Sequence, residues 1–513
     1  MNLVDCRDQW HFNSQYRCWC LEDVVYTDSP TNPEAQRLSV FVPEPFMSAP
    51  GVIAPGAAMG SFTAQTAPVI FENNSAGYRQ MANTPLGDFR DESAKYLARG
   101  MVYVTCGCRG RESVDREGRL CAKSPWTLVD LKMAIRFLRH NAAALPGDFS
   151  KVISVGWSAG GAMSALLGVT GNNTAYDPFL KKNGAFMAES DAVLAAQIYC
   201  PITDLEHADA AYEWQFRADA ENEASFGHPA GTMTAFQSAL SAKLSAHYMD
   251  YFNGLALRHP ETGDLLTIGA DGRSGTGYEY LMLQLERSAT DYLTRLAAGK
   301  LEESFSVEDY LAGRYSRQTS RLRRTAEGFA HDLIEIPGKD KHSWLRWDGE
   351  KAQIDGLDAY VLNHRRRMKP CTAFDALNCS SPENQELGRA ECDRMHFSAD
   401  VRKAVETLCE SFPEETPALL AAFADAAEDT ELKQRCALIN PMNFIGQGAE
   451  HYRIRVGACD ADTSFSVSMV LALALANAGK DVDYALVWDR PHCEADYPGE
   501  VCDWIESLCE YHN

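Results

Sequence analysis

The chain has 513 residues, 45% of them hydrophobic, and a formal net charge of −23 at pH 7. This length suffices for a large core and predicts two structural units. The acidic charge argues against a nucleic-acid partner, whose phosphates it would repel. Residues 1–16 lack the apolar segment of a signal peptide, and no stretch approaches eighteen consecutive apolar residues. We therefore expect a cytoplasmic protein without a membrane partner, unless a leader has been removed.

Sixteen cysteines are present, and in the absence of a leader free thiols are the expectation. The C-x-C pairs Cys18/Cys20 and Cys106/Cys108 have no second C-x-x-C and no His pair at zinc-ligand spacing. Alternation along a strand explains these pairs equally well. We therefore expect no metal centre.

In the first 204 residues, strand patterns alternate with helix patterns. Strands are predicted at 38–42, 67–71, 101–105, 152–155 and 195–200, and an amphipathic helix at 126–140. Alternating strands and helices predict a parallel sheet with crossover helices. In such sheets the functional site lies at the carboxyl ends of the strands.

Residues 156–161 read Gly-Trp-Ser-Ala-Gly-Gly and match the G-x-S-x-G nucleophile elbow, in which a tight strand-to-helix turn exposes a serine. The pattern alone is common by chance, so its context matters. Here a β-branched run precedes the turn, and the helix-forming run 162–167 follows it. This context predicts that Ser158 is a nucleophile, and the alternative is a buried structural serine.

Residues 205–435 are helical in pattern, heavily charged and poor in β runs. Strands are predicted again at 452–456 and 483–488, with a helix at 464–478 between them. The sequence therefore predicts an α/β core formed by residues 1–204 and 436–513, with residues 205–435 inserted as a lid. We interpret the first basic cluster of this insertion as solvated helix faces that pair with nearby acids. That cluster consists of Arg314, Arg317, Arg321, Arg323 and Arg324, and a second one follows at 365–367.

A serine hydroxyl needs a histidine base and an orienting carboxylate, which in this fold follow in the chain order Ser, Asp or Glu, His. His492 lies just past the last predicted strand, and Asp460 and Asp462 lie just past the preceding one. Either carboxylate fits the pattern. The alternatives are N-caps of the next helix for the two acids and a turn residue for His492.

The oxyanion hole is expected to use the backbone N–H of Ala159 and one from the loop after strand 67–71. In that loop Gly77 allows the close approach that an oxyanion requires. The alternative is that Gly77 only forms a turn.

Several blocks resemble bacterial tannases, the tannin acyl hydrolases of the α/β-hydrolase fold, over nearly the full chain. The blocks are 109–111, 156–161, 200–202, 205–209, 212–216, 381–384, 460–465 and 491–492. The resemblance implies a triad at Ser158, Asp460 and His492. It further implies that Asp462, Lys369 and Glu383 hold the galloyl hydroxyls, with the ring between Ile202 and Pro382.

The chain departs from the family at two places. Ala76-Gly77-Tyr78 stands where the family often has Gly-Gly-Tyr, so the oxyanion loop is expected to be stiffer. Trp157 occupies the place of a cysteine that pairs, in fungal tannases, with the one matching Cys493, so that bridge is not expected here. Without the resemblance, Lys369 would be interpreted as a surface charge and Glu383 as a loop carboxylate.

These observations predict a serine esterase that cleaves galloyl esters of tannins and alkyl gallates without a cofactor. A flat trihydroxy ring needs polar partners at one edge, which Asp462, Glu383 and Lys369 supply. The small-molecule partner is therefore a phenolic ester. The alternative within this class is a feruloyl or other phenolic-acid esterase, and a non-catalytic protein of the same fold is the alternative from another class.

Overall fold

The centre of the molecule is a mixed sheet of nine strands. The computed structural model describes residues 3–88, 90–223, 229–324, 329–493 and 495–511. The strand order is β1-β2-β3-β9-β8-β10-β11-β18-β19. The bounds are β1 His11–Asn13, β2 Cys18–Val25, β3 Arg37–Pro43, β8 Pro68–Asn73, β9 Val102–Cys106, β10 Asp148–Trp157, β11 Ala195–Tyr199, β18 His451–Gly457 and β19 Asp481–Val487.

The sheet from β9 to β19 is parallel, and β1, β2 and β3 add an antiparallel edge. The parallel sheet predicted from the sequence is therefore confirmed, with an antiparallel extension. Strands β8, β9 and β10 are almost wholly buried, and they are rich in β-branched and aromatic residues, as is typical of parallel strands covered on both faces.

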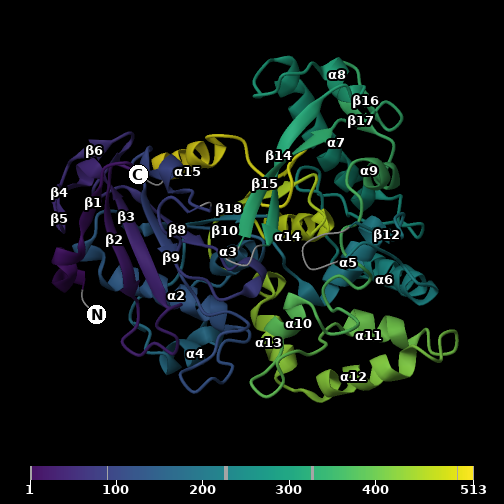
Figure 1. The fold of residues 1–513 in the computed structure, drawn as a ribbon, viewed down its shortest axis with the longest axis horizontal. Helices are drawn as coiled ribbons and strands as arrows, with labels where there is room; N and C mark the ends of the chain where they lie inside the picture. The colour runs from purple at the N-terminus through teal and green to yellow at the C-terminus, as the bar shows by residue number, and fades with distance from the viewer. Residues whose placement is uncertain (1–2, 89, 224–228, 325–328, 494, 512–513) are drawn as a thin grey trace.

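Helices flank the sheet (Figure 1), and α14 packs on β18 and β19. Every residue of α3 is buried, and α3 packs on β10 and β11. The bounds are α1 Ser93–Leu97, α2 Trp126–His140, α3 Ala159–Val169, α4 Asp177–Lys182, α14 Phe465–Asn477 and α15 Glu500–Tyr511. The α/β-hydrolase fold predicted from the sequence is confirmed. Within the described ranges, no helix is both long and apolar enough to cross a membrane.

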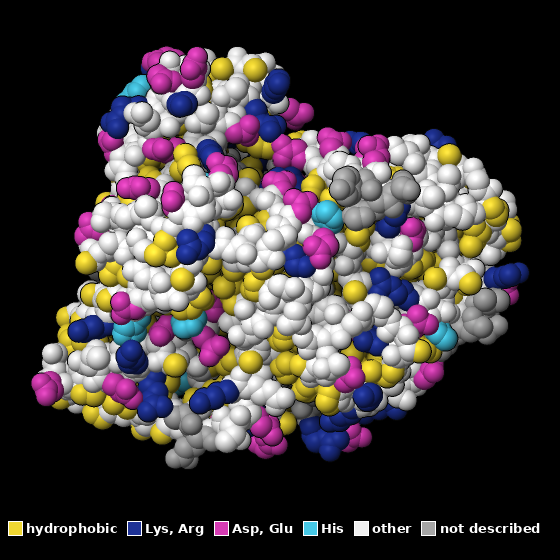
Figure 2. All heavy atoms as spheres, turned by 180° about the vertical axis from the view of Figure 1, so that it is seen from behind, with side chains coloured by type: hydrophobic (Ala, Val, Ile, Leu, Met, Phe, Trp, Pro, Cys, Tyr) yellow, Lys and Arg dark blue, Asp and Glu magenta, His cyan; other side chains and the backbone are white. Residues whose placement is uncertain are grey.

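A large, mainly helical insertion joins β11 to β18, which are hydrogen-bonded neighbours. It occupies the right half of Figure 1, and its upper lobe around α7 and α8 projects beyond the core in the reverse view, where acidic and basic side chains are interspersed (Figure 2). Its helices are α5 Leu205–Phe216, α6 Ala235–Gly254, α7 Thr276–Ala297, α8 Val307–Leu311, α9 Leu357–Asn363, α10 Pro382–Glu386, α11 Ala399–Glu406, α12 Thr416–Glu428 and α13 Leu432–Leu438. The expected domain boundaries at 204/205 and 435/436 stay predictions.

One expectation for the insertion is wrong. The first arginine cluster does not lie on helix faces, because most of it belongs to β14 (Ser316–Arg324), which pairs with β15 (Phe329–Pro337) in an antiparallel hairpin. The charged sequence of β14 conceals its strand character, and the β-branched residues of β15 supply the propensity for the pair. Two short hairpins, β12 (Glu221–Asn222) with β13 (Gly231–Thr232) and β16 (Leu345–Trp347) with β17 (Ala352–Ile354), accompany it.

Candidate active site

Ser158 stands in the turn between β10 and α3, where both elements were predicted. Its backbone, with φ 60° and ψ −124°, is strained for a residue other than glycine. A Cβ at Gly156 would overlap the carbonyl oxygen of Gly160, and one at Gly161 would overlap that of Tyr199. Glycine is therefore required on both sides, and the turn presents a half-buried Ser158 at the carboxyl edge of the sheet.

Asp460 and His492 meet at the same edge, past the ends of β18 and β19. The Nδ1 atom of His492 lies 2.7 Å from Oδ2 of Asp460, whereas Asp462 is 4.0 Å away. The backbone N–H of Asp462 donates to Oδ1 of Asp460 at 2.8 Å. Of the two carboxylates that the strand-end argument left open, Asp460 makes the hydrogen bond to the imidazole.

The two groups shift each other's ionisation. Burial raises the pKa of Asp460, but the charge and hydrogen bond of His492 outweigh it and hold the pKa below its usual value. Burial lowers the pKa of His492, but the carboxylate of Asp460 outweighs it and holds the pKa well above the usual value. Nδ1 is therefore the nitrogen committed to Asp460, and Nε2 remains for proton transfer.

The end of β11 connects Ser158 to this pair. The backbone N–H of Ser158 donates to the carbonyl of Tyr199 at 3.0 Å, and that of Ile202 donates to the carbonyl of Ser158 at 3.3 Å. The backbone N–H of Cys493 donates to Sγ of Cys200 at 3.3 Å, and this sulfur clusters with Asp460 and His492. Ser158, Ile202 and His492 are thus brought to one place.

The predicted oxyanion loop lies against the elbow. Gly77 is in the short 3-10 helix η3 (Ala76–Tyr78) with φ 58°. Among the described residues, no atom lies within 4 Å of the position that a Cβ would take at Gly77. Nε of Arg111 donates to its carbonyl at 2.8 Å, which orients the following peptide. The other expected donor, the N–H of Ala159, begins α3, where the helix dipole favours negative charge.

Tyr78 links this loop to the candidate acyl-binding residues. Its hydroxyl donates to the carbonyl of Ile202 at 2.8 Å. Burial, and then the charges of Glu383 and Glu386, raise the pKa of this phenol. Tyr78 therefore lies between Ile202, at the core edge, and Glu383, on the insertion.

Lys369 is held next to the loop that carries Asp460 and Asp462. The hydroxyl of Tyr212 on α5 accepts the backbone N–H of Lys369 at 3.0 Å and donates to the carbonyl of Ala461 at 3.0 Å. Lys369 is only 9% exposed, and its ammonium lies over the ring of Phe374. The interpretation of Lys369 as a surface charge is therefore wrong.

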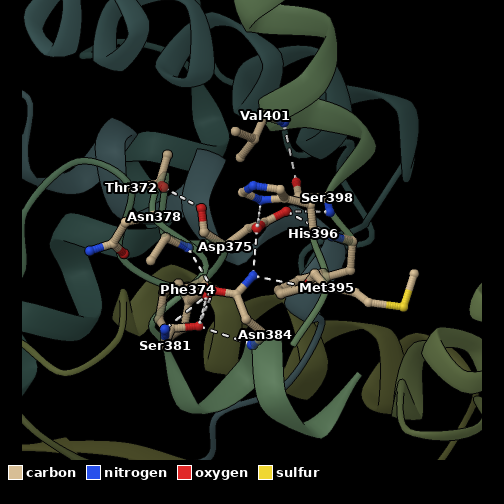
Figure 3. A network of polar contacts seen from close by, with 12 residues as sticks. Thr372, Phe374, Asp375, Asn378, Ser381, Asn384, Met395, His396, Ser398 and Val401 are labelled. Atoms are coloured by element: carbon tan, nitrogen blue, oxygen red, sulfur yellow. Dashed lines mark hydrogen bonds and ion pairs between the residues drawn. The ribbon is translucent and has the colours of Figure 1, made fainter. Parts of the chain in front are cut away.

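Pro382 and Glu383 open α10, whose N-terminus is fixed by a capping box between Ser381 and Asn384. A buried network around Asp375 holds this box in place (Figure 3). Oδ1 of Asp375 accepts from Asn384 at 2.7 Å and pairs with Nδ1 of His396 at 2.6 Å. Its Oδ2 accepts the backbone N–H groups of residues 397 and 398. The position of Glu383 is therefore imposed by a network from the surrounding insertion.

Glu383 is 5% exposed, and its Oε2 has no hydrogen-bond partner in the described part of the chain. Burial raises its pKa, while the charge of Lys369 opposes this rise. A buried oxygen without a partner costs free energy unless a ligand group pairs with it. Glu383 therefore offers an unpartnered buried oxygen to a polar ligand, within the electrostatic influence of Lys369.

One face of α5 carries supporting residues that the sequence interpretation did not single out. The carboxylate of Asp209 accepts the backbone N–H groups of residues 373–375, and Glu213 forms a fully buried ion pair with Arg367. Together with Tyr212 they occupy positions i, i+3 and i+4, which share one helix face. The signal in the sequence was the spacing of these three polar residues, which places them on one face of the helix.

The elbow at the end of β10, the acid after β18 and the histidine after β19 define an α/β-hydrolase. The BD-FAE family model, of α/β-hydrolase type, matches residues 110–247. No curated protein matches the chain. Among solved structures, the tannin acyl hydrolase from Lactobacillus plantarum is 30% identical, with a TM-score of 0.78, 99% of this chain and 98% of that chain covered.

Two further solved structures are similar to this chain over nearly its full length. A tannin acyl hydrolase in complex with ethyl gallate is 31% identical, with a TM-score of 0.77, 96% of this chain and 94% of that one covered. The Fusobacterium nucleatum tannase is 27% identical, with a TM-score of 0.76, and the coverage is 96% and 95%. The chain belongs to the tannase family.

Proposed function

We propose that this protein is a serine esterase that hydrolyses galloyl esters through an acyl-enzyme. The observation that carries the proposal is the 2.7 Å contact between His492 and Asp460 at the sheet edge where the elbow presents Ser158. Nε2 of His492 takes the proton of Ser158 as Oγ attacks the ester carbonyl, while Asp460 holds the imidazole. The N–H groups of Ala159 and Gly77 stabilise the oxyanion.

The reaction then proceeds in two halves. The tetrahedral intermediate collapses, and the alcohol leaves with the proton that His492 returns to it. Water, deprotonated by His492, attacks the acyl-Ser158 ester, and the free acid is released. The residues present suffice for both halves.

The acyl pocket is the second part of the proposal. Glu383, Lys369 and Asp462 pair with the phenolic hydroxyls, and Ile202 and Pro382 contact the two faces of the ring. The unpartnered, buried Oε2 of Glu383 supports this, since a phenolic O–H would satisfy it. Related structures of tannin acyl hydrolase in complex with ethyl gallate and with 3,4-dihydroxybenzoate lend further support.

A substrate panel tests the proposal. We expect kcat/KM to fall from methyl gallate to methyl protocatechuate and further to methyl ferulate. A preference for ferulate would favour the feruloyl-esterase alternative, and comparable values for methyl benzoate would indicate an unselective carboxylesterase. A fluorophosphonate probe checks the mechanism, because failure to label Ser158 would favour a non-catalytic protein.

A further inference from the structure

A second cluster of side chains that could bind a metal ion includes residues from the two loops that carry Asp460 and His492. It comprises His364 after α9, Cys459 after β18 and Asp489 after β19. Nε2 of His364 lies 3.4 Å from Sγ of Cys459 and 3.4 Å from Oδ1 of Asp489. Sγ of Cys459 lies 3.9 Å from the same carboxylate oxygen. All three residues are partly buried.

These distances fit a shared ion. Zinc binds Cys sulfur at about 2.3 Å and His nitrogen or carboxylate oxygen at about 2.0–2.2 Å, usually as a tetrahedron, which places ligand atoms about 3.3–3.6 Å apart. The two 3.4 Å distances match the distances between ligand atoms in such a tetrahedron. The 3.9 Å distance between Cys459 and Asp489 requires only a small movement of the side chains. An N···O distance of 3.4 Å is also long for a hydrogen bond, whose usual range ends near 3.2 Å.

The surroundings orient the ligands as in a metal site. Oδ2 of Asp489 accepts from Arg317 and from the hydroxyl of Tyr310, both at 2.6 Å, so Oδ1 is left facing His364 and Cys459. The imidazole of His364 stacks on Trp488, with ring centroids 4.4 Å apart. Outer contacts of this kind fix the orientation of first ligands.

The charges also fit. A neutral imidazole, a thiolate and a carboxylate are the ligand forms to which a divalent ion binds. A divalent ion bound to one thiolate and one carboxylate is a neutral centre. The positive charge of Arg317 would still be balanced, because its guanidinium also pairs with the carboxylate of Glu303 at 2.8 Å.

We propose that His364, Cys459 and Asp489 bind one thiophilic divalent cation of the Zn²⁺ type, with a fourth position for water. The Sγ–metal bond forms as the thiol proton of Cys459 passes to solvent. Because Cys459 directly precedes Asp460, and Asp489 lies three residues before His492, the bound ion joins the two loops that carry this pair. The ion has no part in the ester chemistry.

Cobalt is the probe for this site, because a thiolate–Co²⁺ bond gives a near-ultraviolet charge-transfer band. The full-length, chelator-treated protein is titrated with Co²⁺ alone, and we expect the band to saturate at one ion per chain. Cys459→Ser should abolish the band. The matched control is Cys200→Ser, which removes the thiol of the other Cys–Asp–His cluster and should retain it.

A second variant keeps the test decisive if Cys459→Ser does not fold. His364→Gln should weaken Co²⁺ affinity at least about tenfold. Added Zn²⁺ should raise the Tm of the wild type and of Cys200→Ser, with little effect on His364→Gln. The proposal is overturned if the wild type gives no band, or if the band survives Cys459→Ser and disappears in Cys200→Ser.

Discussion

The hydroxyl of Tyr212 lies 3.0 Å from the carbonyl oxygen of Ala461 and, at the same distance, accepts the backbone N–H of Lys369. One side chain of the insertion therefore connects the segment with Lys369 to the loop with Asp460 and Asp462. The phenolic oxygen of Tyr212 thus fixes the position of the proposed acyl pocket relative to the Asp460–His492 pair.

Tyr212→Phe should therefore impair gallate recognition more than ester cleavage itself. The change leaves the Ala461 carbonyl and two backbone N–H groups without their buried partner, at about 1–3 kcal/mol for each such group. We expect KM for methyl gallate to rise about tenfold, with a smaller effect on methyl benzoate. Tyr452→Phe is the control, because that buried hydroxyl has no hydrogen bond within the described residues. Equal losses for both esters would contradict this role.

Ser158→Ala and His492→Ala should each lower kcat for methyl gallate by about 10⁴-fold or more, since either change leaves only binding and oxyanion stabilisation. Circular dichroism should show an unchanged fold. Ser150→Ala, an exposed serine on β10, should retain full activity. If Ser158→Ala kept more than about one hundredth of kcat, Ser158 would not be the nucleophile.

Glu383→Gln should reduce kcat/KM for methyl gallate and leave that for methyl benzoate nearly unchanged. A site built to pair with phenolic hydroxyls rejects analogues that lack them by up to about 10⁴-fold, and this ratio should shrink in the variant. The exposed Glu391→Gln serves as the control. An unchanged gallate-to-benzoate ratio in Glu383→Gln would place the hydroxyl-binding edge elsewhere.

The pH profile of kcat/KM should rise as His492 loses its proton, because the base acts in the neutral form. Carboxylates of Asp460 and Asp462 stabilise the imidazolium, so the midpoint should lie above about 6.5 in the wild type. In Asp462→Asn less charge stabilises the imidazolium, the proton leaves at lower pH, and the midpoint should fall. The exposed Asp8→Asn should leave it in place. An upward shift in Asp462→Asn would be incompatible with this arrangement.

The parallel strands could be predicted because each contains a short run of β-branched, aromatic or other apolar residues between turns. The helix predicted at 126–140 coincides with α2, and the strand at 67–71 differs from β8 by one or two residues at its ends. The edge strands β1 and β2 were not predicted, because their composition is mixed and their pairing depends on β3. The order of elements was also sufficient to place Asp460 and His492 at one edge.

The supporting contacts could not be predicted in the same way. Arg367 belongs to a run of three arginines that has the pattern of a solvated surface, yet its guanidinium is fully buried against Glu213, 154 residues earlier. Likewise, His396 pairs with Asp375, and α10 separates these two residues along the chain. Such pairs depend on long-range packing, which local composition does not encode.

The insertion leaves the sheet after β11 and returns at β18, and these two strands are adjacent and in parallel register. Its length therefore has no effect on the register of the sheet, and the entropy of closing a longer loop grows only slowly with its length. Exchange of this one contiguous stretch between related genes would carry Lys369, Pro382 and Glu383 together into a new host. The proposed triad residues Ser158, Asp460 and His492 would stay at the ends of the core strands. Under the proposed function, selectivity for the acid half of an ester can therefore diverge while the residues that cleave the bond are inherited unchanged.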